Sequence, residues 1–151
     1  DGIPIPECQH SADPKVVAIN NAIEVDLFTQ VASEAAGPRQ ISGTGGQLDF
    51  IIGAFKSEGG KGLICINSTY KKKDGSTGSR IVPTLAPGTI VTCPRSVVHY
   101  IVTEFGVAQM KAKATWQRAE ALINISHPDF REQLIKDAAA MGIWRQSNKI
   151  L

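Results

Sequence analysis

The spacing of apolar residues in the first part of the chain predicts strands followed by a helix. A short apolar run occupies residues 16–19, and apolar and polar positions alternate over residues 23–27, as is typical of β-strands. Asn20 and Asn21 would form the bend between the two segments. Beyond a glycine-rich turn the period becomes that of one buried helix face, with apolar residues at i, i+3, i+4 and i+7: Leu48, Ile51, Ile52 and Phe55.

The middle of the chain predicts further strands. Residues 62–66 have the composition of a short buried strand, and residues 67–79 form a polar run that predicts a loop with a basic tip. Apolar segments at residues 80–85, 89–93 and 99–103 are separated by prolines and a Pro-Gly pair, which predicts a strand for each segment. We therefore expect a sheet of five or six strands.

The last third of the chain returns to a helical period. One apolar set predicts a helix near residues 116–123, and a second set predicts a helix near residues 130–141. Pro128 suits the first turn of the second helix, Ser126 or His127 suits its N-cap, and Gly142 suits its end. Strands that alternate with helices predict a layered α/β domain with a mixed sheet, in which ligands gather beyond the strand ends.

Size and composition fit one globular domain. The 151 residues suffice to bury roughly two thirds of the surface of the unfolded chain. The hydrophobic fraction of 42% is ordinary, and no apolar run approaches the ~20 residues that cross a membrane, so we expect no membrane anchor. The net charge of +2, with aromatic residues that do not alternate with basic ones, argues against nucleic acid as a partner.

Cysteines and prolines bear on the cell compartment and on the domain limits. Cys8, Cys65 and Cys93 are widely separated and odd in number, which favours reduced thiols in a cytoplasmic protein over a disulfide framework or a metal site. Prolines among polar residues mark residues 1–12 as an extended leader, which suggests that the sequence begins within a longer protein. The domain itself would span residues 13–144, followed by a tail at residues 145–151.

A glycine-dense turn, SGTGG at residues 42–46, runs directly into the first predicted helix. Glycine tolerates positive φ and admits a ligand close to the backbone, while a helix start presents unpaired N–H groups and a partial positive charge. A phosphate, a carboxylate or a developing oxyanion would fit there. A plain tight turn is the other explanation, since it is the commoner use of glycine. The spacing matches neither the dinucleotide fingerprint nor the P-loop.

Glu104 closes an apolar strand and is followed by Phe105 and Gly106. We expect either a half-buried carboxylate with a raised pKa or a solvated glutamate at a strand end. His99, an odd number of positions earlier, would point to the opposite face of the strand, so the two residues are not expected to form an acid/base pair. No spacing of His, Cys and Asp resembles a metal site.

A run of lysines lies on the polar loop, at Lys71, Lys72 and Lys73. These side chains would either grip a phosphate-bearing ligand or form a solvated loop tip. Ser42 and Ser68 lack the flanking glycines of a hydrolase nucleophile, which argues against a serine hydrolase.

Four segments taken together resemble the acetyl-CoA hydrolase/transferase family, and within it the 4-hydroxybutyrate and butyryl-CoA:acetate CoA-transferases. They are ISGTGGQLDF at 41–50, SRIVP at 79–83, HYIVTEFG at 99–106 and ALINISHPDFR at 121–131. The resemblance runs from about Asp13 to Met141. It implies a layered CoA-transferase-like α/β domain with a mixed, mostly parallel sheet flanked by helices.

The resemblance also implies an activity. Members of the family move CoA between a short-chain acyl-CoA and a carboxylate through a glutamyl-CoA thioester, formed on a glutamate in the half that precedes the matched region. No segment before Asp13 resembles the motif of that glutamate. The chain is thus expected to be the C-terminal half of such an enzyme, with an upstream N-terminal domain as its partner, and to be inactive alone.

The site residues follow from the same resemblance. The backbone N–H of Gly46 would stabilise the oxyanion of the thioester, and Glu104 would position the upstream glutamate. The other CoA-binding residues implied are Gly43, Gly45, Gln47, Lys71, Lys72 and Lys73. Coenzyme A enters as a substrate, and no metal is expected.

Two alternatives remain open from the sequence. In the first, the chain is half of an acyl-CoA hydrolase, in which water accepts the acyl group. In the second, it is a non-catalytic module that binds acyl-CoA or a nucleotide. An exposed inter-domain face would also favour self-association, for example as a homodimer.

Overall fold

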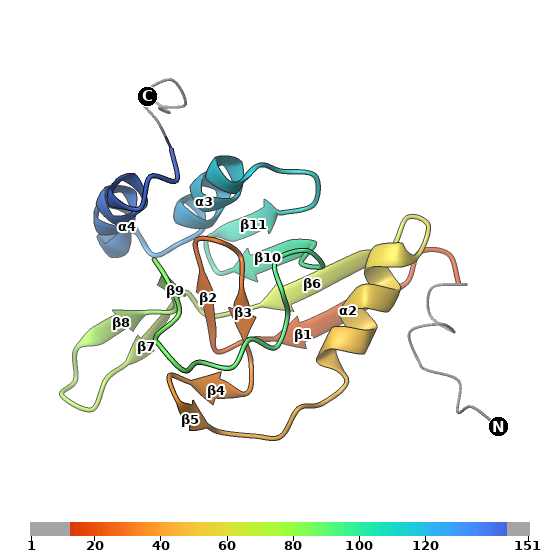
Figure 1. Ribbon diagram of the computed structural model, residues 1–151, viewed down its shortest axis with the longest axis horizontal. Helices are drawn as coiled ribbons and strands as arrows, with labels where there is room; N and C mark the ends of the chain where they lie inside the picture. The colour runs from red at the N-terminus through yellow and green to blue at the C-terminus, as the bar shows by residue number, and fades with distance from the viewer. Residues whose placement is uncertain (1–12, 145–151) are drawn as a thin grey trace.

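The computed structural model describes residues 13–144, whose centre is a four-stranded sheet (Figure 1). The strand order is β1 (Val17–Asn21), β6 (Lys61–Cys65), β10 (Tyr100–Thr103) and β11 (Gly106–Gln109). β1, β6 and β10 are parallel, whereas β11 runs antiparallel to β10 after a tight turn. The sheet is therefore mixed and mostly parallel, as predicted. The expected count of five or six strands is wrong, because the other apolar segments pair elsewhere.

A second, smaller sheet has the order β3 (Val31–Ala32), β2 (Glu24–Asp26) and β9 (Ile81–Val82). β4 (Ala35–Ala36) and β5 (Arg39–Gln40) form a short hairpin beside it. The strand expected at residues 80–85 is thus reduced to β9. The strand expected at residues 89–93 is limited to one bridge, between Cys93 and Val31, because the turn at Gly88 and the proline at position 94 leave little extended chain between them.

The polar run expected to be a loop contains a β-hairpin. β7 (Thr69–Lys71) pairs with β8 (Thr77–Ser79) around a turn in which Gly75 has a positive φ of 84°. Tyr70 packs directly against Gly78, where a Cβ would come within 2.6 Å of the tyrosine ring. The Asp74-Gly75 pair is typical of a β-hairpin turn, but the lysine-rich polar sequence around it favoured the prediction of a loop.

Each predicted helix is present. α2 (Gln47–Lys56) follows the glycine-rich turn, and α3 (Thr115–Asn124) and α4 (Pro128–Ala140) lie together at the opposite end of the molecule (Figure 1). His127 is the N-cap of α4, since its Nδ1 accepts a hydrogen bond of 3.3 Å from the backbone N–H of Asp129. Pro128 occupies the first position of α4, and Gly142 follows its end with a positive φ of 67°, as the sequence predicts.

α2 and α3 cover the same face of the main sheet. Ile51 of α2 lies over Gly62 of β6, and Ile125 at the end of α3 lies over Gly106 of β11. Side chains on this face form the core, with Ile64 and Ile101 fully buried. Side chains of the opposite face are exposed or half-buried, and the most exposed apolar ones are Val17 (55%), Ile19 (67%) and Val107 (62%).

Candidate functional site

The parallel strands end side by side, and a groove of about 640 Å³ lies at their carboxyl ends. The last residues of the three strands and the residues directly after them line the groove together with Arg80: residues 21–23 at the end of β1, 65–67 at the end of β6 and 102–104 at the end of β10. The guanidinium of Arg80 lies over the ring of Tyr70 and donates a hydrogen bond of 2.8 Å to the carbonyl of Ile23. The expectation that ligands gather at the strand ends thus has a matching cavity.

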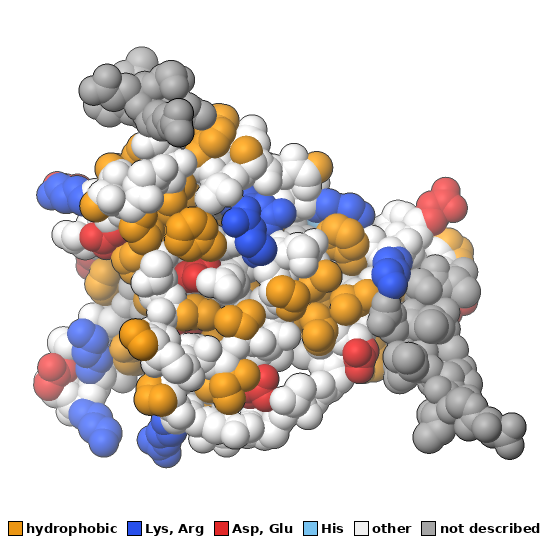
Figure 2. Space-filling view, viewed as in Figure 1, with side chains coloured by type: hydrophobic (Ala, Val, Ile, Leu, Met, Phe, Trp, Pro, Cys, Tyr) orange, Lys and Arg blue, Asp and Glu red, His pale blue; other side chains and the backbone are white. Residues whose placement is uncertain are grey.

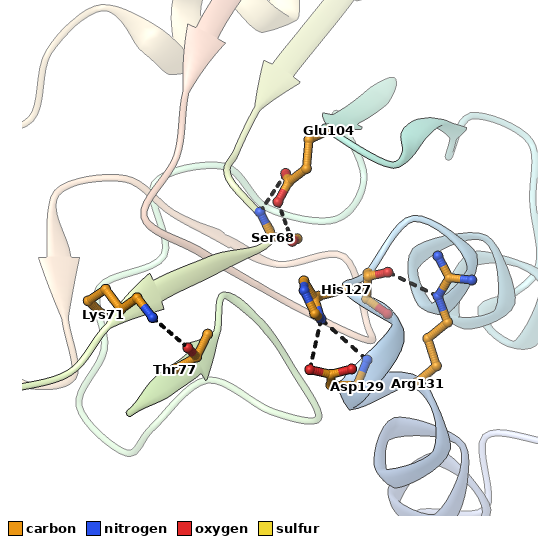
Figure 3. Close-up of polar contacts among 8 residues, drawn as sticks. Ser68, Lys71, Thr77, Glu104, His127, Asp129 and Arg131 are labelled. Carbon is orange, nitrogen blue, oxygen red and sulfur yellow. Dashed lines mark hydrogen bonds and ion pairs between the residues drawn. The ribbon is translucent and has the colours of Figure 1, made fainter. Parts of the chain in front are cut away.

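Glu104 lies at the mouth of this groove and is held by Ser68 (Figure 3). Ser68 Oγ donates a hydrogen bond of 2.5 Å to Oε1, and Ser68 N donates one of 2.9 Å to Oε2. Partial burial alone would raise the pKa of Glu104, but the hydrogen bonds from Ser68 outweigh it and hold the pKa below its usual range. Of the two expectations for Glu104, the half-buried carboxylate with a raised pKa is wrong. The exposed glutamate at a strand end agrees with the structure, where both carboxylate oxygens also accept hydrogen bonds.

Aromatic and basic side chains from the start of α4 lie beside the Glu104 turn. The ring of His127 meets Phe105 edge-on at 5.4 Å, and the guanidinium of Arg131 lies 5.8 Å from the centre of the same ring. Arg131 Nε also donates a hydrogen bond of 3.0 Å to the carbonyl of Ser126 (Figure 3). The start of α4 therefore packs against the β10–β11 turn.

His99 takes no part in the groove. It is buried, stacks on Tyr100 at 4.2 Å and meets Phe55 edge-on, and burial together with Lys111 and Lys61 lowers its pKa. Glu104 instead lies in the turn that follows β10, bound to Ser68. The two residues are not a pair, in agreement with the sequence argument.

The glycine-rich loop, residues 42–46, is exposed and leads into the start of α2. None of Gly43, Gly45 and Gly46 has a positive φ, so the turn does not require glycine for its backbone conformation. A Cβ at Gly43 or Gly45 would meet nothing within 4 Å, and one at Gly46 would meet only the ring of Phe50 at 3.3 Å. Gly46 is the N-cap of α2 and supplies no side-chain hydrogen bond to the helix start. The glycine-rich loop thus leaves open space around its own backbone at the N-terminus of α2.

Glu34 anchors the glycine-rich loop and was not identified from the sequence. Its side chain is only 4% exposed, and its Oε2 accepts a hydrogen bond of 2.6 Å from Thr44 Oγ1, while Thr92 Oγ1 donates to Oε1 at 3.3 Å. Its backbone carbonyl accepts hydrogen bonds from the N–H groups of Ile41 and Ser42. The only sequence signal was a lone acidic residue within a run of small and apolar residues.

The lysine run does not line the groove that contains Glu104. Lys71, Lys72 and Lys73 are exposed on the β7–β8 hairpin, where Lys71 Nζ donates a hydrogen bond of 3.2 Å to Thr77 Oγ1 (Figure 3). Lys72 borders a separate hollow of about 250 Å³ between this hairpin and α4. The structure brings Glu104 together with Ser68, but it does not bring the lysines to either of them.

Other candidate features are limited within residues 13–144. The thiols of Cys65 and Cys93 are free, and burial raises the pKa of Cys93 to about 11, while Cys8 lies outside the described residues. No group of three His, Cys, Asp or Glu side chains in this range could hold a metal ion. No helix in this range has both the length and the apolar character to cross a bilayer. The view in Figure 2 shows basic and acidic side chains scattered among hydrophobic groups, so neither sign of charge dominates that face.

Comparison with known proteins identifies the family. Residues 6–138 match the family described as acetyl-CoA hydrolase/transferase C-terminal domain. The chain belongs to this family. It is 59% identical over 133 residues to the butyryl-CoA:acetate CoA-transferase of Anaerostipes caccae, a match that covers 88% of this chain and 30% of that protein. It is 52% identical over 122 residues to the 4-hydroxybutyrate coenzyme A transferase of Clostridium kluyveri, covering 81% of this chain and 28% of that protein.

The fold of this acetyl-CoA hydrolase/transferase C-terminal domain also matches a crystal structure. RipA from Yersinia pestis superposes with a TM-score of 0.81 at 38% sequence identity, over 91% of this chain and 30% of that chain. The family resemblance and the α/β fold predicted from the sequence are thus confirmed. The chain spans about 30% of the length of the first curated relatives it matches.

Proposed function

We propose that this domain forms the C-terminal half of a CoA-transferase that moves CoA between a short-chain acyl-CoA, such as 4-hydroxybutyryl-, butyryl- or acetyl-CoA, and a carboxylate. The family match and the names of the relatives support this activity. The exchange would pass through a glutamyl-CoA thioester on a glutamate contributed by an upstream N-terminal domain. A cytoplasmic location, which the cysteines favour, belongs to the same proposal.

The open space at the glycine-rich loop is the observation that carries the proposal. Backbone N–H groups at the start of α2 can donate to an oxyanion only if the reacting carbonyl comes close, and Gly43 and Gly45 leave room for such an approach. Gly46 would be the oxyanion donor. Gln47 would help to hold the substrate, since its Nε2 is buried with no hydrogen-bond partner among the described residues.

The remaining roles are assigned by position. Glu104 at the mouth of the groove would position the upstream glutamate. Lys71, Lys72 and Lys73, exposed on a hairpin, would interact with the CoA phosphates through charge.

Substitution in the glycine-rich loop tests the function without disturbing the fold. Gly45→Val places its side chain in open space, so the fold should be kept, while the approach of the substrate should be blocked. In the complete polypeptide that carries the upstream domain, we expect acyl-CoA:acetate exchange to fall about 100-fold, the scale of a lost oxyanion donor. The exposed Thr84→Ala variant is the control and should exchange normally.

The same assay separates the alternatives. Release of free CoA that does not depend on acetate would identify an acyl-CoA hydrolase, an activity that the family description also includes. Binding of acyl-CoA without turnover would instead identify a non-catalytic module. Unchanged exchange by a folded Gly45→Val variant would place the oxyanion site elsewhere.

A further inference from the structure

We propose that Ser68 is a positioning residue, which fixes the carboxylate of Glu104 in one orientation at the mouth of the groove. This inference rests on the proposed CoA-transferase function and extends it to a residue outside the glycine-rich loop. Ser68 donates to both carboxylate oxygens, through Oγ at 2.5 Å and through N at 2.9 Å. Two hydrogen bonds from one residue fix both the position and the rotation of the carboxylate.

Ser68 is itself held firmly. Its side chain is fully buried, and its carbonyl accepts a hydrogen bond of 2.9 Å from the backbone N–H of Arg80. Two residues earlier, Ile66 N donates to the carbonyl of Val102 at 2.9 Å, which extends the pairing of β6 with β10 up to this point. The donor groups therefore lie in a short connection between β6 and β7 that backbone hydrogen bonds hold at Ile66 and at Ser68 itself.

The backbone that carries Glu104 is anchored on the other side. Thr103 Oγ1 donates a hydrogen bond of 2.6 Å to the carbonyl of Ile125 at the end of α3, and it accepts one of 3.1 Å from Phe105 N. The buried hydroxyl of Thr103 thus anchors the backbone on both sides of Glu104, at Thr103 itself and at Phe105. Only the side-chain torsions of Glu104 remain to be fixed, and Ser68 fixes them.

The charge interaction with His127, at the start of α4, also lowers the pKa of Glu104. Two further basic residues lie in the neighbourhood, since Arg80 lines the same groove and Arg131 lies over the adjacent ring of Phe105. The hydrogen bonds from Ser68 keep the pKa of Glu104 low despite partial burial. Glu104 therefore acts as a fixed acceptor, to which donor groups beside the upstream glutamate can hydrogen-bond.

The exposure of the two partners argues against a purely structural contact. Glu104 is exposed and contributes little buried surface, whereas the groups that hold it are fully buried. An arrangement of this kind orders an exposed carboxylate without adding to the core.

A double-mutant cycle on the complete polypeptide tests the proposal, with Ser68→Ala, Glu104→Gln and the double variant. We expect Ser68→Ala to lower kcat of acyl-CoA:acetate exchange at least about tenfold, with KM for acyl-CoA within about twofold. Added to Glu104→Gln, it should cause little further loss, because the two residues act as one unit. The acid limb of the pH profile should move to higher pH in Ser68→Ala, since loss of the hydroxyl raises the pKa of Glu104.

Ser76→Ala is the matched control. Ser76 also donates through N and Oγ to an exposed carboxylate, that of Asp74 on the hairpin turn, although both bonds go to the one oxygen Oδ1. This variant should keep both kcat and the pH profile. Ser68→Cys, close in volume but a weak donor, repeats the test if Ser68→Ala does not fold.

The outcomes separate this inference from the proposed function. Normal exchange by Ser68→Ala beside an impaired Glu104→Gln, or additive losses in the double variant, would overturn the role of Ser68 alone. Normal exchange by Glu104→Gln, or no exchange by the unsubstituted polypeptide, would overturn the assignment of Glu104 and the role of Ser68 with it.

Discussion

At the scale of single residues, two polar contacts of the candidate site join residues that are not neighbours in the sequence. Ser68 and Glu104 are 36 positions apart, and they meet because Val102 pairs with Cys65 in the parallel register of β10 and β6. Glu34 and Thr44 are closer in sequence, but their contact depends on how the glycine-rich loop folds back. The sequence could identify Glu104 and the glycine-rich loop, but not their partners. The strand register brings Ser68 to Glu104, and the path of the loop brings Thr44 to Glu34.

The contact between Thr44 and Glu34 yields a residue-scale prediction. Thr44→Val should destabilise the chain by about 1 kcal/mol, because it leaves one oxygen of the buried Glu34 carboxylate without its donor. Amide hydrogen exchange at Gly45 and Gly46 should become faster at the same time. Chemical denaturation and exchange mass spectrometry measure the two effects.

Thr89→Val is the matched control for Thr44→Val. The Thr89 hydroxyl is buried but has no hydrogen-bond partner among the described residues, so its removal should cost nothing or slightly stabilise the fold. Equal losses of stability in the two variants would show that the Thr44 hydroxyl does not hold Glu34.

At the scale of elements, the sequence predicted helices better than strands. The helices were found because apolar residues repeat with a clear helical period, and the His127 cap and Pro128 mark the start of α4. Strands were harder, because β3 and β9 have only two residues each and β7 and β8 carry polar side chains. β11 was missed since its Val107 and Gln109 face solvent, which weakens the apolar signal.

The connection between α2 and β6 supports a prediction at this scale. A Cβ at Gly60 would lie 2.3 Å from the carbonyl oxygen of Ala54 and 2.8 Å from the Cβ of Ser57. Gly60→Ala should therefore push α2 away from β6 and lower the free energy of unfolding by about 1–3 kcal/mol, the typical cost of overpacking. Urea denaturation monitored by circular dichroism measures the change in the free energy of unfolding.

Gly45→Ala serves as the comparison for Gly60→Ala. Its Cβ enters open space and its φ is not positive, so it should be neutral or stabilise the chain by up to about 1 kcal/mol through a less flexible unfolded state. A loss at Gly45 as large as that at Gly60 would mean that the glycine-rich loop packs more tightly than its geometry indicates.

At the scale of the whole molecule, the α/β class followed from the alternation of strands and helices, but the strand order did not. β1, β6 and β10 lie next to one another although the second sheet and two hairpins separate them along the chain. That order places residues 21, 67 and 104 around one groove. Local periodicity carries no information about which distant strands pair. The sequence could therefore predict that a ligand site lies at the strand ends, but not which residues line it.

Because α2 and α3 cover only one face of the main sheet, side chains on the two faces contribute unequally to the free energy of unfolding. Ile64 on β6 points into the core and is fully buried, whereas Ile19 on the neighbouring β1 is 67% exposed on the other face. Ile64→Ala should cost about 2–5 kcal/mol because it opens a cavity, while Ile19→Ala should cost no more than about 0.5–1 kcal/mol. Thermal and urea denaturation of the two variants of this chain, measured side by side, provide the comparison. A similar loss in both would require Ile19 to be covered in solution, and it would mean that both faces of the main sheet are packed.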